Sequence, residues 1–135
     1  MNKKEIIDTI NKYKLDKEQF IVISGSALVL NDVKENTNDI DIWCSDSYFN
    51  YLLEKYNCKY KKTNKVGEKI YFMDEYFNIG VSFKPEQINL VEGIKVASLN
   101  DVLEFKQFLN REKDKEDIDL IRNIIESNYK KGKIF

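Results

Sequence analysis

The sequence predicts a mixed α/β domain of the α+β kind, in which helices flank a small mixed β-sheet and the last two helices form a C-terminal pair. Apolar residues recur every three or four positions near both ends of the chain, which is typical of amphipathic helices. Short apolar or alternating runs lie between them, as expected for strands. Because 135 residues suit one ordinary domain, we expect residues 1–135 to form a single unit.

Four elements are predicted in the first third of the chain. Isoleucines at helical spacing predict an amphipathic helix over residues 3–14. The apolar run 19–23 predicts a buried strand. We expect a short helix over residues 26–30, beginning at the serine. Strict alternation of polar and apolar residues predicts a second strand over 39–43.

The middle of the chain predicts a helix followed by a hairpin. Either Asp46 or Ser47 can cap a helix whose apolar face lies within residues 48–56. The runs 58–63 and 68–73 then read as two antiparallel strands around a turn that contains a glycine.

The last third predicts one strand, one extended piece and two helices. Residues 77–83 alternate as a strand does, and residues 90–96 form a short extended piece. Ser98, with Asp101 three positions later, is close to a capping box for the next helix, and the final helix spans about 114–129. The residues expected to be buried in these helices are Leu99, Val102, Leu103, Phe105, Phe108, Ile118, Leu120, Ile121, Ile124, Ile125 and Tyr129.

The amino-acid composition excludes several classes of catalytic site, metal site and binding partner. The chain contains no histidine, which excludes Ser-His-Asp and Cys-His triads and histidine-ligated zinc. The net charge is −1, so no global field draws the protein to nucleic acid or to an anionic membrane. Cys44 and Cys58 are expected to be reduced thiols. We find no signal peptide and no apolar stretch long enough for a membrane span, and therefore expect a cytoplasmic protein without a membrane partner.

Gly25 and Ser26 lie where a buried strand meets a helix. Backbone N–H groups at such a junction can bind an anion, and the absence of a Cβ on Gly25 lets a phosphate approach closely. Ser26 adds a hydroxyl. A glycine and a serine at a strand end are by themselves weak evidence for such a site.

Asp39 and Asp41 are the stronger signal. Residues i and i+2 of a strand point to the same face, so these two carboxylates lie side by side. Their mutual repulsion is relieved by a divalent cation, and Mg²⁺ favours carboxylate oxygens together with substrate phosphates. The alternative is an edge strand with a solvated acidic face.

Two blocks of the sequence resemble one family. Gly25-Ser26 followed by Asp39-Ile40-Asp41 resembles the first motif of the DNA polymerase β-like nucleotidyltransferase superfamily. The segment 101–114, followed by Asp117, resembles a downstream motif of its AbiEii-like group. The chain looks most like the small members of the superfamily, which include the AbiEii-like toxins and relatives of the antibiotic nucleotidyltransferases. The resemblance spans roughly residues 20–120.

The resemblance implies the nucleotidyltransferase fold and transfer of a nucleoside monophosphate from an NTP, such as ATP, to a hydroxyl with release of pyrophosphate. One or two Mg²⁺ ions would be the cofactor, held by Asp39 and Asp41. Lys106 would join these two acids as a catalytic residue. The residues implied in nucleotide binding are Gly25, Ser26, Lys106, Arg111, Lys113 and Asp114. Residues 106 and 111 are expected to point to one region at the end of a helix.

The resemblance also implies a third carboxylate on a later strand. On the predicted strand 77–83, the positions that face Asp39 and Asp41 are Asn78 or Gly80, and neither is acidic. Acids close to this strand are Glu68, Asp74 and Glu75. The alternative to an enzyme is therefore a catalytically silent member of the fold that binds nucleotide, RNA or a protein partner.

The acceptor and the partners follow only from the resemblance. It implies tRNA or a small molecule as acceptor, a toxin or defence role, and an antitoxin protein as a candidate partner. Lysines gather in residues 59–69, where they are predicted either to contact RNA phosphate or the nucleotide, or to form a solvated hairpin.

Overall fold

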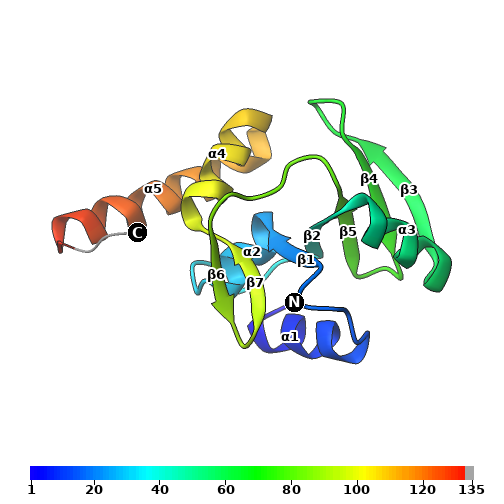
Figure 1. Cartoon of the computed structure of the whole chain (residues 1–135). Helices are drawn as coiled ribbons and strands as arrows, with labels where there is room; N and C mark the ends of the chain where they lie inside the picture. The colour runs from blue at the N-terminus through cyan, green and yellow to red at the C-terminus, as the bar shows by residue number, and fades with distance from the viewer. Residues whose placement is uncertain (133–135) are drawn as a thin grey trace.

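A mixed β-sheet runs through the centre of the computed structural model, which describes residues 1–132 (Figure 1). Seven strands of this part of the chain form one sheet in the order β3-β4-β5-β2-β1-β7-β6. The strands are β1 (Phe20–Ile23), β2 (Ile40–Cys44), β3 (Cys58–Thr63), β4 (Lys69–Met73), β5 (Phe77–Gly80), β6 (Ile88–Val91) and β7 (Ile94–Ala97). The mixed sheet with flanking helices confirms the predicted fold class.

The helices surround this sheet. They are α1 (Lys3–Lys12), α2 (Ser24–Leu30), α3 (Asp46–Lys55), α4 (Leu99–Leu109) and α5 (Lys115–Lys130), with a 3₁₀ turn η1 (Glu112–Asp114) between the last two. Helix α2 packs against β1, β2, β7 and α4, and α4 packs against α5. The last two helices are therefore the predicted C-terminal pair.

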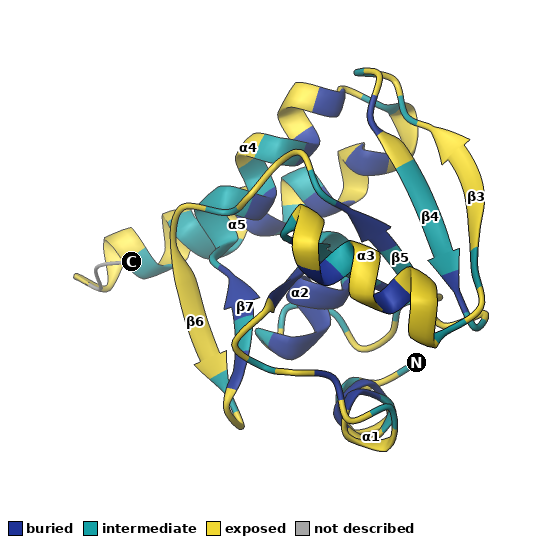
Figure 2. Cartoon of the chain, turned by 45° about the vertical axis from the view of Figure 1, so that its right-hand side comes forward, coloured by how far each residue is buried: buried dark blue, intermediate teal, exposed yellow. Residues whose placement is uncertain are grey.

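The core lies on the central strands and on α2. Figure 2 shows buried residues gathered there, whereas β3 and β6 at the two sheet edges are exposed. Ile40 and Ile42 of β2 are fully buried, and the residues that alternate with them are only half-buried. The alternation in the sequence therefore marks which face of β2 meets the core.

The register of the sheet brings Asp41 and Asn78 together beside the end of β1. In the antiparallel pair of β1 and β2, Ile23 lies opposite Asp41. In the parallel pair of β2 and β5, Asp41 lies opposite Asn78. The junction between β1 and α2 therefore lies beside the start of both β2 and β5.

The extended piece predicted over 90–96 is a hairpin of two strands, so that prediction was wrong. Glu92 and Gly93 both have positive φ, 48° and 80°, as a two-residue type I′ turn requires. Strand β7 then pairs in parallel with β1, which no local pattern indicates. This turn is hard to recognise from the sequence, because its first residue is a glutamate and asparagine or aspartate is usual there.

Two helix starts differ from the predictions. Helix α2 begins at Ser24 rather than at Ser26, so Gly25 and Ser26 lie in its first turn. Helix α3 is capped by Ser45 rather than by Asp46 or Ser47, because the Ser45 hydroxyl accepts a hydrogen bond from the Tyr48 N–H (3.3 Å).

Two residues expected in the core are exposed. Phe108 is 57% exposed, and its ring lies 5.6 Å from that of Phe83, which is itself partly exposed. Tyr129, near the end of α5, is 81% exposed. Cys44 is buried and Cys58 half-buried, and both thiols are free. Among residues 1–132, the helices are too short or too polar to cross a bilayer.

Candidate functional site

Asp39 and Asp41 converge on one amide. The Asn78 side-chain N–H donates to Asp41 Oδ1 at 2.7 Å and to Asp39 Oδ2 at 3.4 Å. Asp41 lies on β2 and Asn78 on the neighbouring β5, where the register places them side by side. The two acids therefore share one face at the start of β2, as their spacing predicts.

The negative charges of Asp39 and Asp41 repel each other in a partly buried place. Burial raises the pKa of the Asp41 carboxyl, and the charge of Asp39 raises it further, whereas the hydrogen bond from Asn78 opposes both effects. A cation at the pair would remove this repulsion. Lys61 of β3 partly does so, because its ammonium lies 3.7 Å from Asp39 Oδ2 and donates to Asn78 Oδ1 at 2.9 Å.

The residues around the pair fit one divalent cation better than two. Asn78 occupies the sheet position facing Asp41, and its amide oxygen can ligate a cation without adding negative charge. Among residues 1–132, no group of three or more His, Cys, Asp or Glu side chains is arranged to hold a metal ion. In this arrangement, however, Asn78 turns its N–H toward the two acids and its oxygen toward Lys61. Two carboxylates thus form a sparse set of oxygen ligands that depends on substrate phosphates to complete it.

Glu68, an acid close to the pair, already makes hydrogen bonds with other residues of the protein. Its carboxylate accepts hydrogen bonds from the Ser82 backbone N–H (3.0 Å) and from the Asn64 side chain (3.2 Å). It fills the space above Gly80, where an added Cβ would lie 2.9 Å from Glu68 Oε2. Glu68 therefore holds the β4 hairpin against the segment that follows β5.

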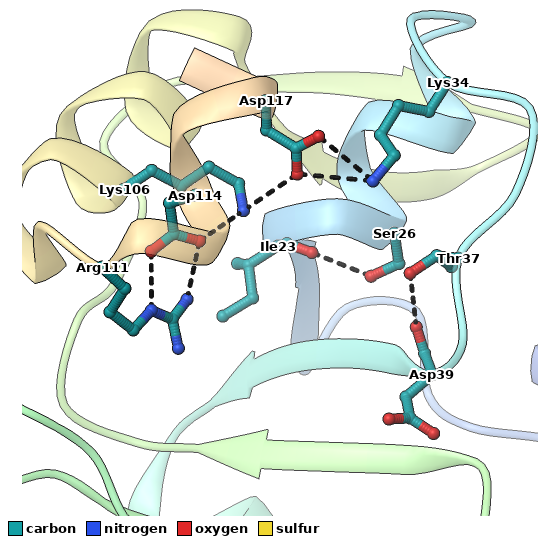
Figure 3. A network of polar contacts seen from close by, with 9 residues as sticks. All are labelled: Ile23, Ser26, Lys34, Thr37, Asp39, Lys106, Arg111, Asp114 and Asp117. Atoms are coloured by element: carbon teal, nitrogen blue, oxygen red, sulfur yellow. Dashed lines mark hydrogen bonds and ion pairs between the residues drawn. The ribbon is translucent and has the colours of Figure 1, made fainter.

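A buried ion network forms the opposite wall (Figure 3). Lys106 of α4 contacts Asp114 and Asp117, each at 3.2 Å. Arg111 binds Asp114 through two hydrogen bonds of 2.6 and 3.0 Å. Lys34, on the segment after α2, reaches Asp117 at 3.1 Å. The three cations outnumber the two acids, so the network keeps a positive charge.

Asp114 is the centre of this network. Burial alone would raise the pKa of its carboxyl, but the hydrogen bond from Arg111 and the charge of Lys106 outweigh burial and hold the pKa below its usual value. The predicted meeting of Lys106 and Arg111 at the end of α4 therefore occurs through this shared acid.

Two further lysines face each other across the site, Lys113 of η1 beside this network and Lys62 on β3. Burial, Arg111 and Lys62 of β3 together lower the pKa of the Lys113 ammonium. Among residues 1–132, neither Lys62 nor Lys113 takes part in an ion pair. Two cations on opposite walls without acidic partners are suited to binding a multiply charged anion.

Ser26 does not present its hydroxyl to this site. The side chain is fully buried, donates to the Ile23 carbonyl at 2.8 Å and accepts from the Asp41 N–H at 2.9 Å. It therefore ties α2 to β1 and β2, and the expectation that Ser26 contacts phosphate does not fit this arrangement. Ser24, with φ of 57°, and Gly25 face the site instead.

A cleft of about 380 Å³ collects these groups. Of the residues predicted from the sequence, it is lined by Gly25, Asp39, Asp41, Lys106, Arg111, Lys113 and Asp114. Other residues that line it include Ser24 and Lys34, which no pattern in the sequence indicated, and Lys61, Lys62 and Asn78. The lysine-rich stretch 59–69 indicated Lys61 and Lys62, and the alternation over 77–83 indicated Asn78 or Gly80.

Comparison with known proteins gives one family and two solved structures. Residues 2–127 match the model of a family described as nucleotidyltransferase of unknown function (DUF6036). No curated protein matches the sequence. The crystal structure of ANT(2″)-Ia in complex with adenylyl-2″-tobramycin is similar at a TM-score of 0.55 and 9% identity, over 89% of this chain and 85% of that one.

The second structure, JHP933 from Helicobacter pylori, has a TM-score of 0.42 and 16% identity, over 65% of this chain and 47% of that one. The family match covers nearly the whole chain, and the similarity to ANT(2″)-Ia shows that the fold is shared. The predicted resemblance to the nucleotidyltransferase superfamily is confirmed, and the chain belongs to the DUF6036 family of nucleotidyltransferases of unknown function.

Proposed function

We propose that the protein transfers a nucleoside monophosphate from an NTP to a hydroxyl acceptor, with a divalent cation bound at Asp39 and Asp41. The observation that carries the proposal is the composition of the cleft. Two convergent carboxylates lie on one wall, and Lys62, Arg111 and Lys113 face them from the others. This arrangement matches a triphosphate that carries a cation.

Asp39 and Asp41 would hold the cation, and the Asn78 amide keeps the two carboxylates aimed at one point. When bound, Mg²⁺ would neutralise charge on the phosphates and on the attacking oxygen. The hydrogen bond from Asn78 holds the half-buried Asp41 in position, and the Asp39 side chain is 30% exposed and accessible to substrate.

The cationic walls would orient the phosphates. Lys62 and Lys113 can each donate to phosphate oxygens, and Arg111 adds a positive charge held in place by Asp114. The acceptor oxygen then bonds to the α-phosphorus while the bond to the bridging oxygen breaks and pyrophosphate leaves. The hydroxyl proton would pass to Asp39, whose side chain is 30% exposed.

The first test measures binding of Mg-ATP, Mg-CTP, Mg-GTP and Mg-UTP by isothermal titration calorimetry. We expect binding to the wild type and loss of binding in the double variant Asp39→Asn/Asp41→Asn. The matched control is Asp8→Asn/Asp119→Asn, which removes two exposed carboxylates on helices. Absence of nucleotide binding by the wild type, or equal binding by both double variants, would contradict the proposal.

A second function, nucleotide binding without transfer, is favoured by one observation. Asn78 stands where a third carboxylate would complete a two-cation site, and it contributes no charge. Incubation with labelled NTPs and total RNA or a panel of hydroxylated small molecules separates the two functions. Incorporation of label into any acceptor rejects the silent alternative.

The acceptors to test first are tRNA and small molecules. A small-molecule acceptor is supported by the structural neighbour ANT(2″)-Ia, whose crystal structure contains an adenylylated small molecule. A toxin role with an antitoxin partner and a cytoplasmic location belong to the same proposal. Co-purification of the protein from its native host tests the partner directly.

A further inference from the structure

A second, apolar pocket adjoins the cleft. It has a volume of about 270 Å³ and lies between α4 and the segment that follows β5. Ile23, Ser24 and Phe105 line both the pocket and the cleft. The two cavities are therefore neighbours across the junction of β1 and α2, close enough for one ligand to occupy both.

Three aromatic rings dominate this pocket. The ring of Phe83 lies 5.2 Å from that of Phe105 and 5.6 Å from that of Phe108, in tilted arrangements. Phe83 is 37% exposed and Phe108 is 57% exposed, although both are large apolar residues. Exposed aromatic residues gathered at a concave surface mark a binding site rather than a part of the core.

The charges of the pocket differ from those of the cleft. Its one cationic side chain, Lys84, lies over the Trp43 ring at 5.2 Å. The acids Glu86, Asp101 and Glu104 lie at the same pocket, and Asp101 accepts the Gln87 backbone N–H at 2.7 Å. Phosphates are therefore disfavoured here, whereas an uncharged flat group is suited to the rings.

We propose that this aromatic pocket binds the nucleobase of the nucleotide whose phosphates occupy the cleft; the inference rests on the proposed function. A nucleotide is anionic at one end and neutral and aromatic at the other, which matches the division between cleft and pocket. Stacking on phenylalanine accepts every base, because each base has a π-face.

The experiment compares two ligands by isothermal titration calorimetry in the presence of Mg²⁺. ATP carries the base, and ribose 5-triphosphate carries the same sugar and phosphates without it. In the variants Phe83→Ala and Phe108→Ala, we expect the affinity for ATP to fall by roughly five- to a hundredfold, as loss of one stacking partner does. The affinity for ribose 5-triphosphate is expected to stay unchanged.

Leu90→Ala is the matched control, because Leu90 is an apolar residue of β6 that is 69% exposed and lies outside the pocket. Equal ATP affinity in the wild type and both phenylalanine variants would overturn the inference. So would equal affinity of the wild type for ATP and ribose 5-triphosphate, and the proposed function would then still stand. If the wild type binds neither ligand, both proposals fail.

Discussion

At the scale of single residues, the Asn78 side chain does three things. It donates to both acids of the cleft, it accepts from Lys61, and it occupies the sheet position opposite Asp41. An aspartate there would create a cluster of three carboxylates in a partly buried place. The amide thus stabilises the pair without a metal, and it limits how strongly the pair can bind one.

We predict that Asn78→Asp strengthens divalent-cation binding by about tenfold, because affinity for such cations rises with the number of charged ligands. The same variant is expected to unfold at a lower temperature than the wild type in EDTA, because three carboxylates repel one another. Titration calorimetry with Mn²⁺ and thermal unfolding with and without Mg²⁺ measure the two effects.

Asn50→Asp is the control for this change, because it adds the same charge at an exposed position of α3. It should alter neither the affinity for Mn²⁺ nor the response of the melting temperature to Mg²⁺. If Asn78→Asp binds the cation no better than the wild type, the side chain at position 78 does not contribute to a cation site.

At the scale of elements, the connection between α4 and α5 owes its shape to buried charge. Asn110 has a left-handed backbone, with φ of 48°, and ends α4. The chain then turns so that Asp114 lies against Lys106 and Arg111, with only 2% of Asp114 exposed. The ion pairs therefore fix how the two C-terminal helices meet at the cleft.

We predict that Asp114→Asn lowers the free energy of unfolding at pH 7 by about 3 kcal/mol, because Lys106 and Arg111 lose the charge that compensates theirs. The pKa of Asp114 is lower in the folded chain than in the unfolded one. Its stabilising effect is therefore present above about pH 4, and it is lost as the pH falls through the folded-state pKa.

Urea unfolding of both proteins between pH 7 and pH 3 tests this expectation. The difference in unfolding free energy should shrink at the acidic end. Asp119→Asn, a change at an exposed site of α5, should show a small difference at every pH. A difference for Asp114→Asn that stays constant down to pH 3 would contradict the ionic origin of the effect.

At the scale of the whole molecule, the described residues share a core that extends across the central strands. Cys44 ends β2 within this core and is fully buried. Burial, with a further contribution from the charge of Asp46, raises the pKa of its thiol to about 12. The thiol is thus unreactive while the core is intact, and its modification reports on opening of the molecule.

We predict that the variant Cys58→Ser, which keeps Cys44 alone, reacts with a thiol reagent at pH 8 only as fast as the protein opens. The rate should rise steeply as urea approaches the unfolding midpoint. The variant Cys44→Ala keeps the half-buried Cys58 and should react faster in the native state. Rapid labelling of Cys44 without denaturant would show that the core at the end of β2 is loosely packed.

Much of the fold was predictable because its signals are local. A few neighbouring residues are enough to recognise the helical period of apolar residues in α5, the alternation in β2 and the capping serine of α4. The hairpin of β6 and β7 was missed, because its turn has an unusual first residue and its pairing with β1 joins segments far apart in the chain.

The candidate site was likewise predictable only in part, where its signals are local in the sequence. By itself, the sequence determined that Asp39 and Asp41 share a face, because side chains alternate along a strand. Only the tertiary structure decided that Asn78 rather than Gly80 joins them, that Ser26 is buried inside the fold, and that Asp114 binds Lys106 and Arg111. These contacts depend on strand register and helix packing, which bring distant residues together and leave no pattern among neighbours in the chain.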